Sequence, residues 1–309
     1  MLGMSTSSLF SFVRPLSFVA AVAVLPLSGA GCAGEDGTEP NPSPDAAPIA
    51  LRLDFAAVVG DEAAACGQTY TQLGANGHTA ELADARMYVS NVELQSDAGE
   101  WVGLTLDETD WQTANIALVD FEDGTAGCSD SGTADTNTTL TGTIADDTYT
   151  AVRFDISVPF EKNHLDNATA DSPLNAPGMF WVWQTGYKFA RFDLLIDEGD
   201  LARWNVHVGS TQCTSDARTE APDEPCARSN RSHVVLDDFD VDADEIVFDI
   251  GALVQNADLG TNLVDTPPGC MSSPMEADDC SPVFSDMGLD FASGDCVDGC
   301  DAQSILSVR

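Results

Sequence analysis

The sequence predicts an all-β fold, an antiparallel, immunoglobulin-like β-sandwich with an irregular, cysteine-rich C-terminal extension. Short runs alternate apolar and polar residues, turn-rich segments separate these runs, and long stretches with helical spacing are scarce. Apolar residues make up 43% of the 309 positions, which is enough to form a core. Many short strands without long intervening helices are typical of a sandwich.

The expected strands follow one another along most of the chain. Leu51, Leu53 and Phe55 alternate with polar residues, and Tyr88–Leu94 repeats the pattern. The clearest alternation is Val152–Val158, which stops at a proline, as a strand does. Further expected strands are Phe180–Trp183, Tyr187–Leu195, Trp204–Val208, Val234–Phe239 and Ile246–Ile250, and Ile250–Leu259 allows a short helix.

The N-terminus has the features of an export signal. Residues 1–31 contain Arg14 as their single charge and an apolar stretch, Leu16–Leu27, that is short for a membrane span. The motif ending at Cys32 resembles a bacterial lipobox, which predicts lipidation of Cys32; the alternative is ordinary cleavage, which leaves a spare thiol. Residues 32–48 are expected to form a disordered tether, 49–265 the sandwich, and 266–309 an extension packed on it.

Cysteine number agrees with an exported protein. If lipid occupies Cys32, eight cysteines remain, and eight allow about 105 pairings. None of their spacings is that of a zinc ribbon, so structural disulfides are expected. Sequence separation favours the pairs Cys213–Cys226, Cys270–Cys280 and Cys296–Cys300, which leaves Cys66–Cys128 as a long-range pair.

The formal net charge of −39 excludes some classes of function. Nucleic-acid binding needs a basic surface, and so does electrostatic docking to an anionic membrane. We therefore expect no nucleic-acid partner, and contact with a membrane only through the lipid anchor. Motifs of hydrolases, nucleotide-binding enzymes and metalloproteases are absent from the sequence, which favours a protein without enzymatic activity.

Histidine and tryptophan are the candidate functional residues. His164 follows the clearest predicted strand, and His207 lies on the strand face opposite Trp204. Trp181 and Trp183 share one face of their strand, two residues after Met179. Each histidine alone is more often structural than metal-binding, and an aromatic-rich strand is more often part of a core.

Taken in order, several segments resemble the MbnP family, the methanobactin-associated periplasmic proteins of the metallo-mystery pair four-cysteine group. The resemblance spans about Leu51 to Leu253, and its four cysteines are Cys66, Cys128, Cys213 and Cys226. His78, His233 and the tail from Pro267 lie outside the motif set. The segments that carry the resemblance are Asp84–Leu94, Leu118–Glu122, Val158–His164, Ser172–Asn175, Met179–Phe189 and His207–Cys213.

The resemblance implies copper, one ion, with His164 and His207 as imidazole ligands and Met179 as a weaker candidate. It also implies that a di-haem partner of the MbnH type, related to cytochrome c peroxidases, oxidises a tryptophan to kynurenine. The candidates for this oxidation are Trp181, Trp183 and Trp204.

The predicted function is thus a copper-binding, lipid-anchored protein of the bacterial cell envelope, in the periplasm or on the outer membrane. The alternatives are a structural or adhesive envelope lipoprotein without metal and, less favoured, a hydrolase.

Overall fold

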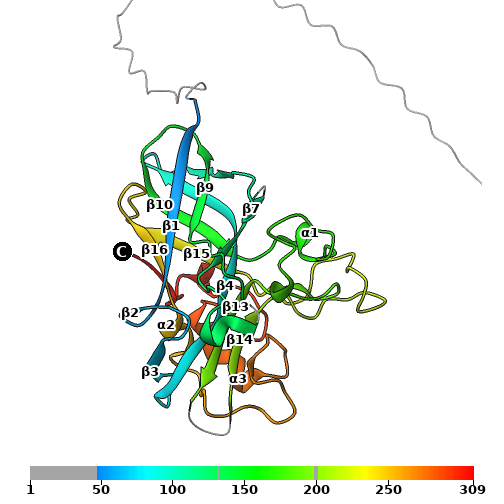
Figure 1. Ribbon diagram of the computed structural model, residues 1–309. Coiled ribbons are helices and arrows are strands. Elements are labelled where there is room, and N and C mark those ends of the chain that lie inside the picture. Colours follow the sequence, from blue (N-terminus) through cyan, green and yellow to red (C-terminus); the bar gives the residue numbers. More distant parts are fainter. Residues whose placement is uncertain (1–46, 114, 131, 198–200) are drawn as a thin grey trace, which may run out of the picture. The chain divides into compact units, whose positions relative to one another are not determined.

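Two packed β-sheets form the core of the computed structural model, which describes residues 47–113, 115–130, 132–197 and 201–309. The predicted signal peptide, Cys32 and nearly all of the tether lie outside the described residues. Figure 1 shows β1 between β9 and β16 in the first sheet. That sheet contains β18 (Leu306–Val308), β16 (Glu245–Asp249), β1 (Ile49–Val59), β9 (Thr139–Ile144) and β6 (Thr105–Leu106), with β2 (Glu62–Ala63) beside β1.

The second sheet is built around β4 (His78–Ser96), the longest strand. Different parts of β4 pair with different strands: its middle lies between β8 and β13, and its C-terminal half pairs with β10 and β5. The other strands are β15 (Ser232–Asp237), β10 (Tyr149–Ile156), β13 (Ala190–Ile196), β14 (Trp204–Val208), β17 (Gly269–Cys270), β3 (Thr69–Leu73), β5 (Trp101–Gly103), β7 (Gln112–Thr113) and β8 (Ile116–Asp120).

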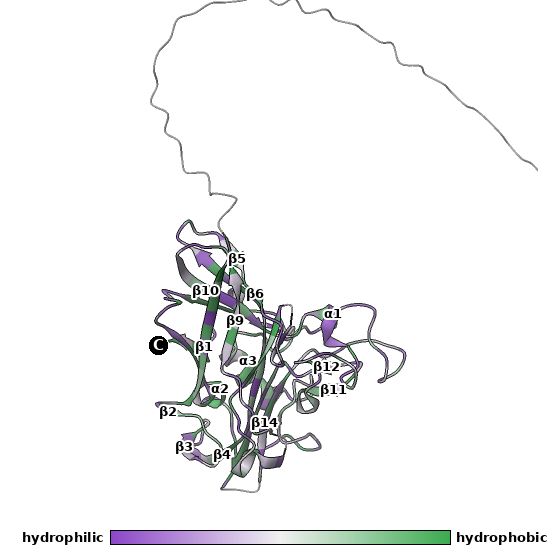
Figure 2. Cartoon of the chain, turned by 45° about the horizontal axis from the view of Figure 1, so that its top comes forward, coloured by the Kyte–Doolittle hydropathy of each residue, from purple (hydrophilic) through white to green (hydrophobic). Residues whose placement is uncertain are grey.

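Aromatic side chains join the two sheets. The Phe55 and Phe154 rings meet edge to face at 5.9 Å, and the Phe192 and Phe248 rings stack at 4.4 Å. Each pair connects a strand of one sheet to a strand of the other, so a single apolar core fills the space between them. Along β1 the buried residues alternate with more exposed ones, as the sequence predicts. In Figure 2, β1 is mostly hydrophobic, whereas α1 and its neighbouring loop are hydrophilic.

The all-β sandwich prediction is confirmed, but the sheets are mixed and not purely antiparallel. β1 pairs with β16 in parallel, and β14 pairs with β17 in parallel. Both parallel partners are reached through long connections, because a tight hairpin can only join antiparallel strands. Alternation of residues within a strand does not carry this directional information.

The C-terminal segment contributes to both sheets. β17 extends the second sheet and β18 extends the first, while α3 (Ala277–Asp286) buries Val283 and Phe284 in the common core. The chain also forms the three disulfides that sequence separation favours, Cys213–Cys226, Cys270–Cys280 and Cys296–Cys300, and the remaining pair, Cys66–Cys128. A short helix, α2 (Ile250–Val254), begins where the sequence allows one.

The functional candidates other than Trp204 gather on the outer side of the second sheet, away from β1. There the chain forms α1 (Phe160–Asn163), a 3-10 turn (Pro177–Met179), β11 (Phe180–Val182) and β12 (Gly186–Tyr187), and Figures 1 and 2 both show these loops on the side opposite β1. None of the helices among the described residues is long and apolar enough to cross a bilayer.

Candidate metal centre

A row of charged and polar residues crosses four neighbouring strands of the second sheet. Arg86 of β4 stands opposite Asp120 of β8 on one side and opposite Arg191 of β13 on the other. Arg191 in turn stands opposite His207 of β14. All four residues are buried, with exposures of 8% or less. Buried charges need partners, so this row requires a second set of groups that neutralise it.

Carboxylates on the same strands supply these partners. Asp84 accepts two hydrogen bonds from Arg86, at 2.8 and 2.5 Å, and lies 3.2 Å from the Arg191 Nε. Asp193 accepts hydrogen bonds from Arg191 at 3.0 and 2.8 Å. A continuous buried ion-pair network therefore lies beneath the loops, and it runs from Arg86 through Asp84 and Arg191 to Asp193.

His207 is the last member of this network. Its Nε2 lies 2.8 Å from Asp193 Oδ1, and the imidazole is 8% exposed. Burial lowers the pKa of His207, although the hydrogen bond to Asp193 opposes that shift. A neutral imidazole that donates Nε2–H to a carboxylate keeps its lone pair on Nδ1. A carboxylate that fixes a histidine in this way is the arrangement seen behind metal-ligating histidines.

His164 lies at the C-terminal end of α1. Its Nδ1 lies 2.9 Å from the Trp183 carbonyl oxygen, which accepts an N–H hydrogen bond, so the lone pair resides on Nε2. Nε2 faces the Asn163 amide at 3.2 Å and the Cys226 sulfur at 3.8 Å. Burial lowers the pKa of His164, and Arg231 lowers it further. This imidazole is therefore also neutral near pH 7.

The segment Trp181–Trp183 contacts the surroundings of both histidines. The Trp183 carbonyl accepts a hydrogen bond from His164. The Trp181 ring lies over Gly209, two residues after His207. A Cβ at Gly209 would lie 2.6 Å from the Trp181 ring, so glycine is needed for this close approach. A groove of about 490 Å³ runs beside Trp181, with Arg218, Pro267 and Met271 in its walls.

The remaining candidates differ in exposure. Trp183 is 38% exposed and Trp181 is half-buried, whereas Trp204 and Met179 are fully buried. Trp204 lies on the face of β14 opposite His207, because alternate strand residues point to opposite faces. Among the described residues, no hydrogen bond joins the Met179 sulfur to either imidazole.

Two clusters of possible metal-binding atoms occur among the described residues. One contains His164, Cys213 and Cys226, and the other contains Glu122, Cys66 and Cys128. The cysteines in both clusters form disulfides and so are not thiolate ligands. His207 is in neither cluster, so this structure does not assemble both imidazoles into one set of ligands.

Comparison with known proteins identifies the family. The MbnP family model matches residues 48–272, which is well over half of the chain. The chain belongs to the MbnP family. The solved structure of MbnP from Methylosinus trichosporium is similar, with a TM-score of 0.73 and 29% sequence identity over 85% of this chain and 98% of that chain. No curated protein matches this chain. Membership in the family supports a methanobactin-associated protein, as the resemblance implied.

Sequence reasoning did not identify Asp84, Arg86, Arg191 and Asp193 as site residues. A signal for them is present, because Asp84-Ala85-Arg86 and Arg191-Phe192-Asp193 place charges at alternate positions inside otherwise apolar strands. Such positions share one face of a strand, and a strand this apolar is expected to be covered on both faces.

Proposed function

We propose that this protein binds one copper ion through His164 and His207 and that it does so without enzymatic activity. Copper would supply a one-electron redox centre. The observation that carries the proposal is that two buried, neutral imidazoles each have one nitrogen held by a protein oxygen atom. The other nitrogen of each ring would be the ligand, and at His164 copper would replace the Asn163 amide that lies 3.2 Å from Nε2.

The donor chemistry fits copper. Neutral imidazole is a preferred ligand of this metal, and the Trp181–Trp183 segment contacts His164 and also Gly209, two residues after His207. Two imidazoles leave coordination positions on copper open, so the proposal includes a third donor. Met179 is the weakest candidate for that donor, since its side chain is fully buried.

A kynurenine formed from Trp181 or Trp183 is the proposed third donor. A di-haem partner of the MbnH type would oxidise the tryptophan, and Trp183 is the more exposed of the two. Trp204 is the least favoured of the three, because it is fully buried and points away from His207. Oxidation at an exposed residue requires no opening of the fold.

The proposed location is the bacterial cell envelope, with lipid on Cys32 as the anchor. The four disulfides support an oxidising compartment, because cytosolic proteins rarely keep such bonds. The N-terminal signal features in the sequence support export.

Metal analysis of the full mature protein tests the copper site. We expect about one copper per chain after co-expression with a di-haem partner and reconstitution with copper. His164→Ala and His207→Ala should each abolish stoichiometric binding, whereas His78→Ala and His233→Ala are matched controls that should retain it. Copper retained in both site variants, or absent from the unmodified protein, would overturn the proposal.

Peptide mass spectrometry tests the maturation step separately. The expected result is the mass shift of a tryptophan-to-kynurenine conversion at Trp181 or Trp183 only, and only when the di-haem partner is co-expressed. Three unmodified tryptophans in protein that nevertheless binds copper would remove the kynurenine from the proposal and leave the imidazoles.

A further inference from the structure

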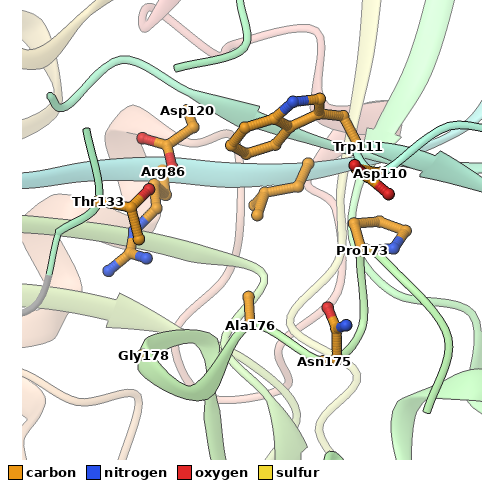
Figure 3. A pocket seen from close by; sticks show the side chains of 10 residues that line it. Arg86, Asp110, Trp111, Asp120, Thr133, Pro173, Asn175, Ala176 and Gly178 are labelled. Atoms are coloured by element: carbon orange, nitrogen blue, oxygen red, sulfur yellow. The ribbon is translucent and has the colours of Figure 1, made fainter. Parts of the chain in front are cut away.

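A separate cavity of about 550 Å³ lies at the other end of the buried charged row. Figure 3 shows it between Trp111, which precedes β8, and the loop Pro173–Gly178. Its volume is within the range that proteins use for small organic ligands. Neither His164 nor His207 lines it, so it is distinct from the candidate metal centre.

The walls of the cavity are largely apolar. The indole of Trp111 forms one wall, Pro173 and Ala176 lie across from it, and Leu118 also lines the cavity. Walls of this kind gain little from a bare metal ion or from inorganic phosphate, but they gain from an organic group that displaces water. The ring of Trp111 also offers a face on which a cation is attracted.

Carboxyl groups stand at both ends of the cavity. Asp120 lies beside Arg86 at one end, and Asp110 lies near Pro173 at the other. Arg86 does not convert the cavity into an anion site, because Asp84 accepts two of its hydrogen bonds and Glu122 lies 3.8 Å from its Nε. Asp110, and Asp120 once it is deprotonated, give the cavity a negative charge, and the chain as a whole is also negative.

We propose that this cavity binds a small organic cation, an ammonium group attached to an apolar or aromatic body. The ammonium group is placed against Asp120, and the apolar body lies between Trp111 and the Pro173–Ala176 loop. The proposal is independent of copper, and it predicts the same binding in metal-free protein.

Binding of a cation at Asp120 is coupled to a proton. Burial raises the pKa of Asp120 to about 8; Arg86 opposes this shift, while Glu122 and Asp84 add to it. Below that pH the free carboxyl is mostly protonated, and an ammonium ion favours the carboxylate. Binding therefore releases a proton, and affinity rises as the pH approaches 8 from below.

Titration calorimetry with three matched probes tests the proposal. Phenethylamine is a cation at pH 7, 2-phenylethanol is its neutral analogue, and phenylacetate is its anionic analogue. We expect phenethylamine to bind about tenfold or more tightly than 2-phenylethanol, and phenylacetate to bind least. Buffers with different ionisation enthalpies should report proton release with phenethylamine alone. Equal affinity for the cation and the alcohol, or no saturable binding of phenethylamine, would overturn the proposal.

Variants locate the binding to this cavity. Asp120→Asn should remove the preference for the cation together with the proton release, and Trp111→Leu should weaken all aromatic probes by about tenfold. Asp110→Asn should have a smaller effect, because Asp110 is exposed. The exposed Asp146→Asn controls for general attraction to an acidic protein. Unchanged binding in Trp111→Leu, or a loss of binding seen only in Asp110→Asn, would contradict the assignment. If Asp120→Asn fails to fold, Trp111→Leu and Asp110→Asn still test whether the probes bind in this cavity.

Discussion

His207 and Asp193 form a buried imidazole–carboxylate pair, with Nε2 and Oδ1 2.8 Å apart. A second pair, His233 and Asp155, has the same separation, but its side chains are 39% and 20% exposed against 10% and 1% in the first pair. The two pairs therefore have the same separation but differ in how strongly solvent screens their charges. The buried pair is also part of a larger ion-pair network, because Asp193 binds Arg191.

Replacement of Asp193 tests this difference. Asp193→Asn leaves the Arg191 charge poorly matched in a buried site, so we expect the free energy of unfolding to fall by about 3 kcal/mol. Asp155→Asn is the matched control and should cost less than about 1 kcal/mol, because solvent screens that pair. Urea unfolding measures the free energy of unfolding of both variants, which can be compared directly if their m-values are equal. Similar losses in the two variants would show that the buried network contributes no special stability.

Asp120 predicts a pH dependence of stability. Its pKa is raised to about 8 in the folded protein, from an ordinary value near 4. The folded state thus holds the proton more tightly than the unfolded state, and the stabilisation from Asp120 is lost as the pH rises from about 4 to about 8.

Asp120→Asn removes this titration, so the stability of the variant should fall less steeply over that range. One proton corresponds to a slope of at most about 1.4 kcal/mol per pH unit. Urea unfolding at several pH values gives the slopes, and Asp110→Asn, which alters an exposed carboxyl of the same cavity, serves as the control. Parallel curves for Asp120→Asn and the unchanged protein would contradict the prediction.

Local sequence pattern was sufficient to predict many of the strands. The alternation Val152–Val158 corresponds to β10, and the position of His207 opposite Trp204 in the strand follows from the same two-residue period. Sequence separation also favoured three of the four disulfides that form and left the fourth as the remaining pair. These features depend on neighbours in the chain, which a single sequence records.

The row from Asp120 to His207 depends on long-range register and was not predicted. Nothing in the sequence near Arg86 indicates that Asp120 and Arg191 stand on either side of it. The parallel pairing of β1 with β16 and the strands that the C-terminal segment adds were not predicted either, because they also depend on pairing between distant parts of the chain. A shift of one residue in register would have put every one of these side chains on the other face.

Gly209 controls the position of Trp181. A Cβ at this position would lie 2.6 Å from the indole and 2.6 Å from the Tyr187 carbonyl, so Gly209→Ala must displace one of them. We expect a loss of about 1–3 kcal/mol and a change in tryptophan fluorescence. Gly103→Ala is the control, because a Cβ there meets nothing within 4 Å. Unchanged stability and fluorescence in Gly209→Ala would show that the ring moves freely.

Arg228 holds the C-terminal segment against the sheet. Its guanidinium is buried, donates hydrogen bonds to the carbonyls of Ser272 and Phe291, and lies 4.5 Å from the centre of the Phe291 ring. Lysine keeps the charge but has neither the planar fork nor the reach to satisfy both carbonyls. Arg228→Lys is therefore expected to loosen this attachment.

Hydrogen exchange gives the measurement. Amides of residues 287–300, which lie outside the strands of both sheets, should exchange about tenfold faster in Arg228→Lys, while β10 and β13 keep their protection. Arg218→Lys is the matched control, since Arg218 is exposed and should leave exchange unchanged. If exchange in the C-terminal segment and the sheets rises together, the segment is not a separate unit but unfolds with the sandwich.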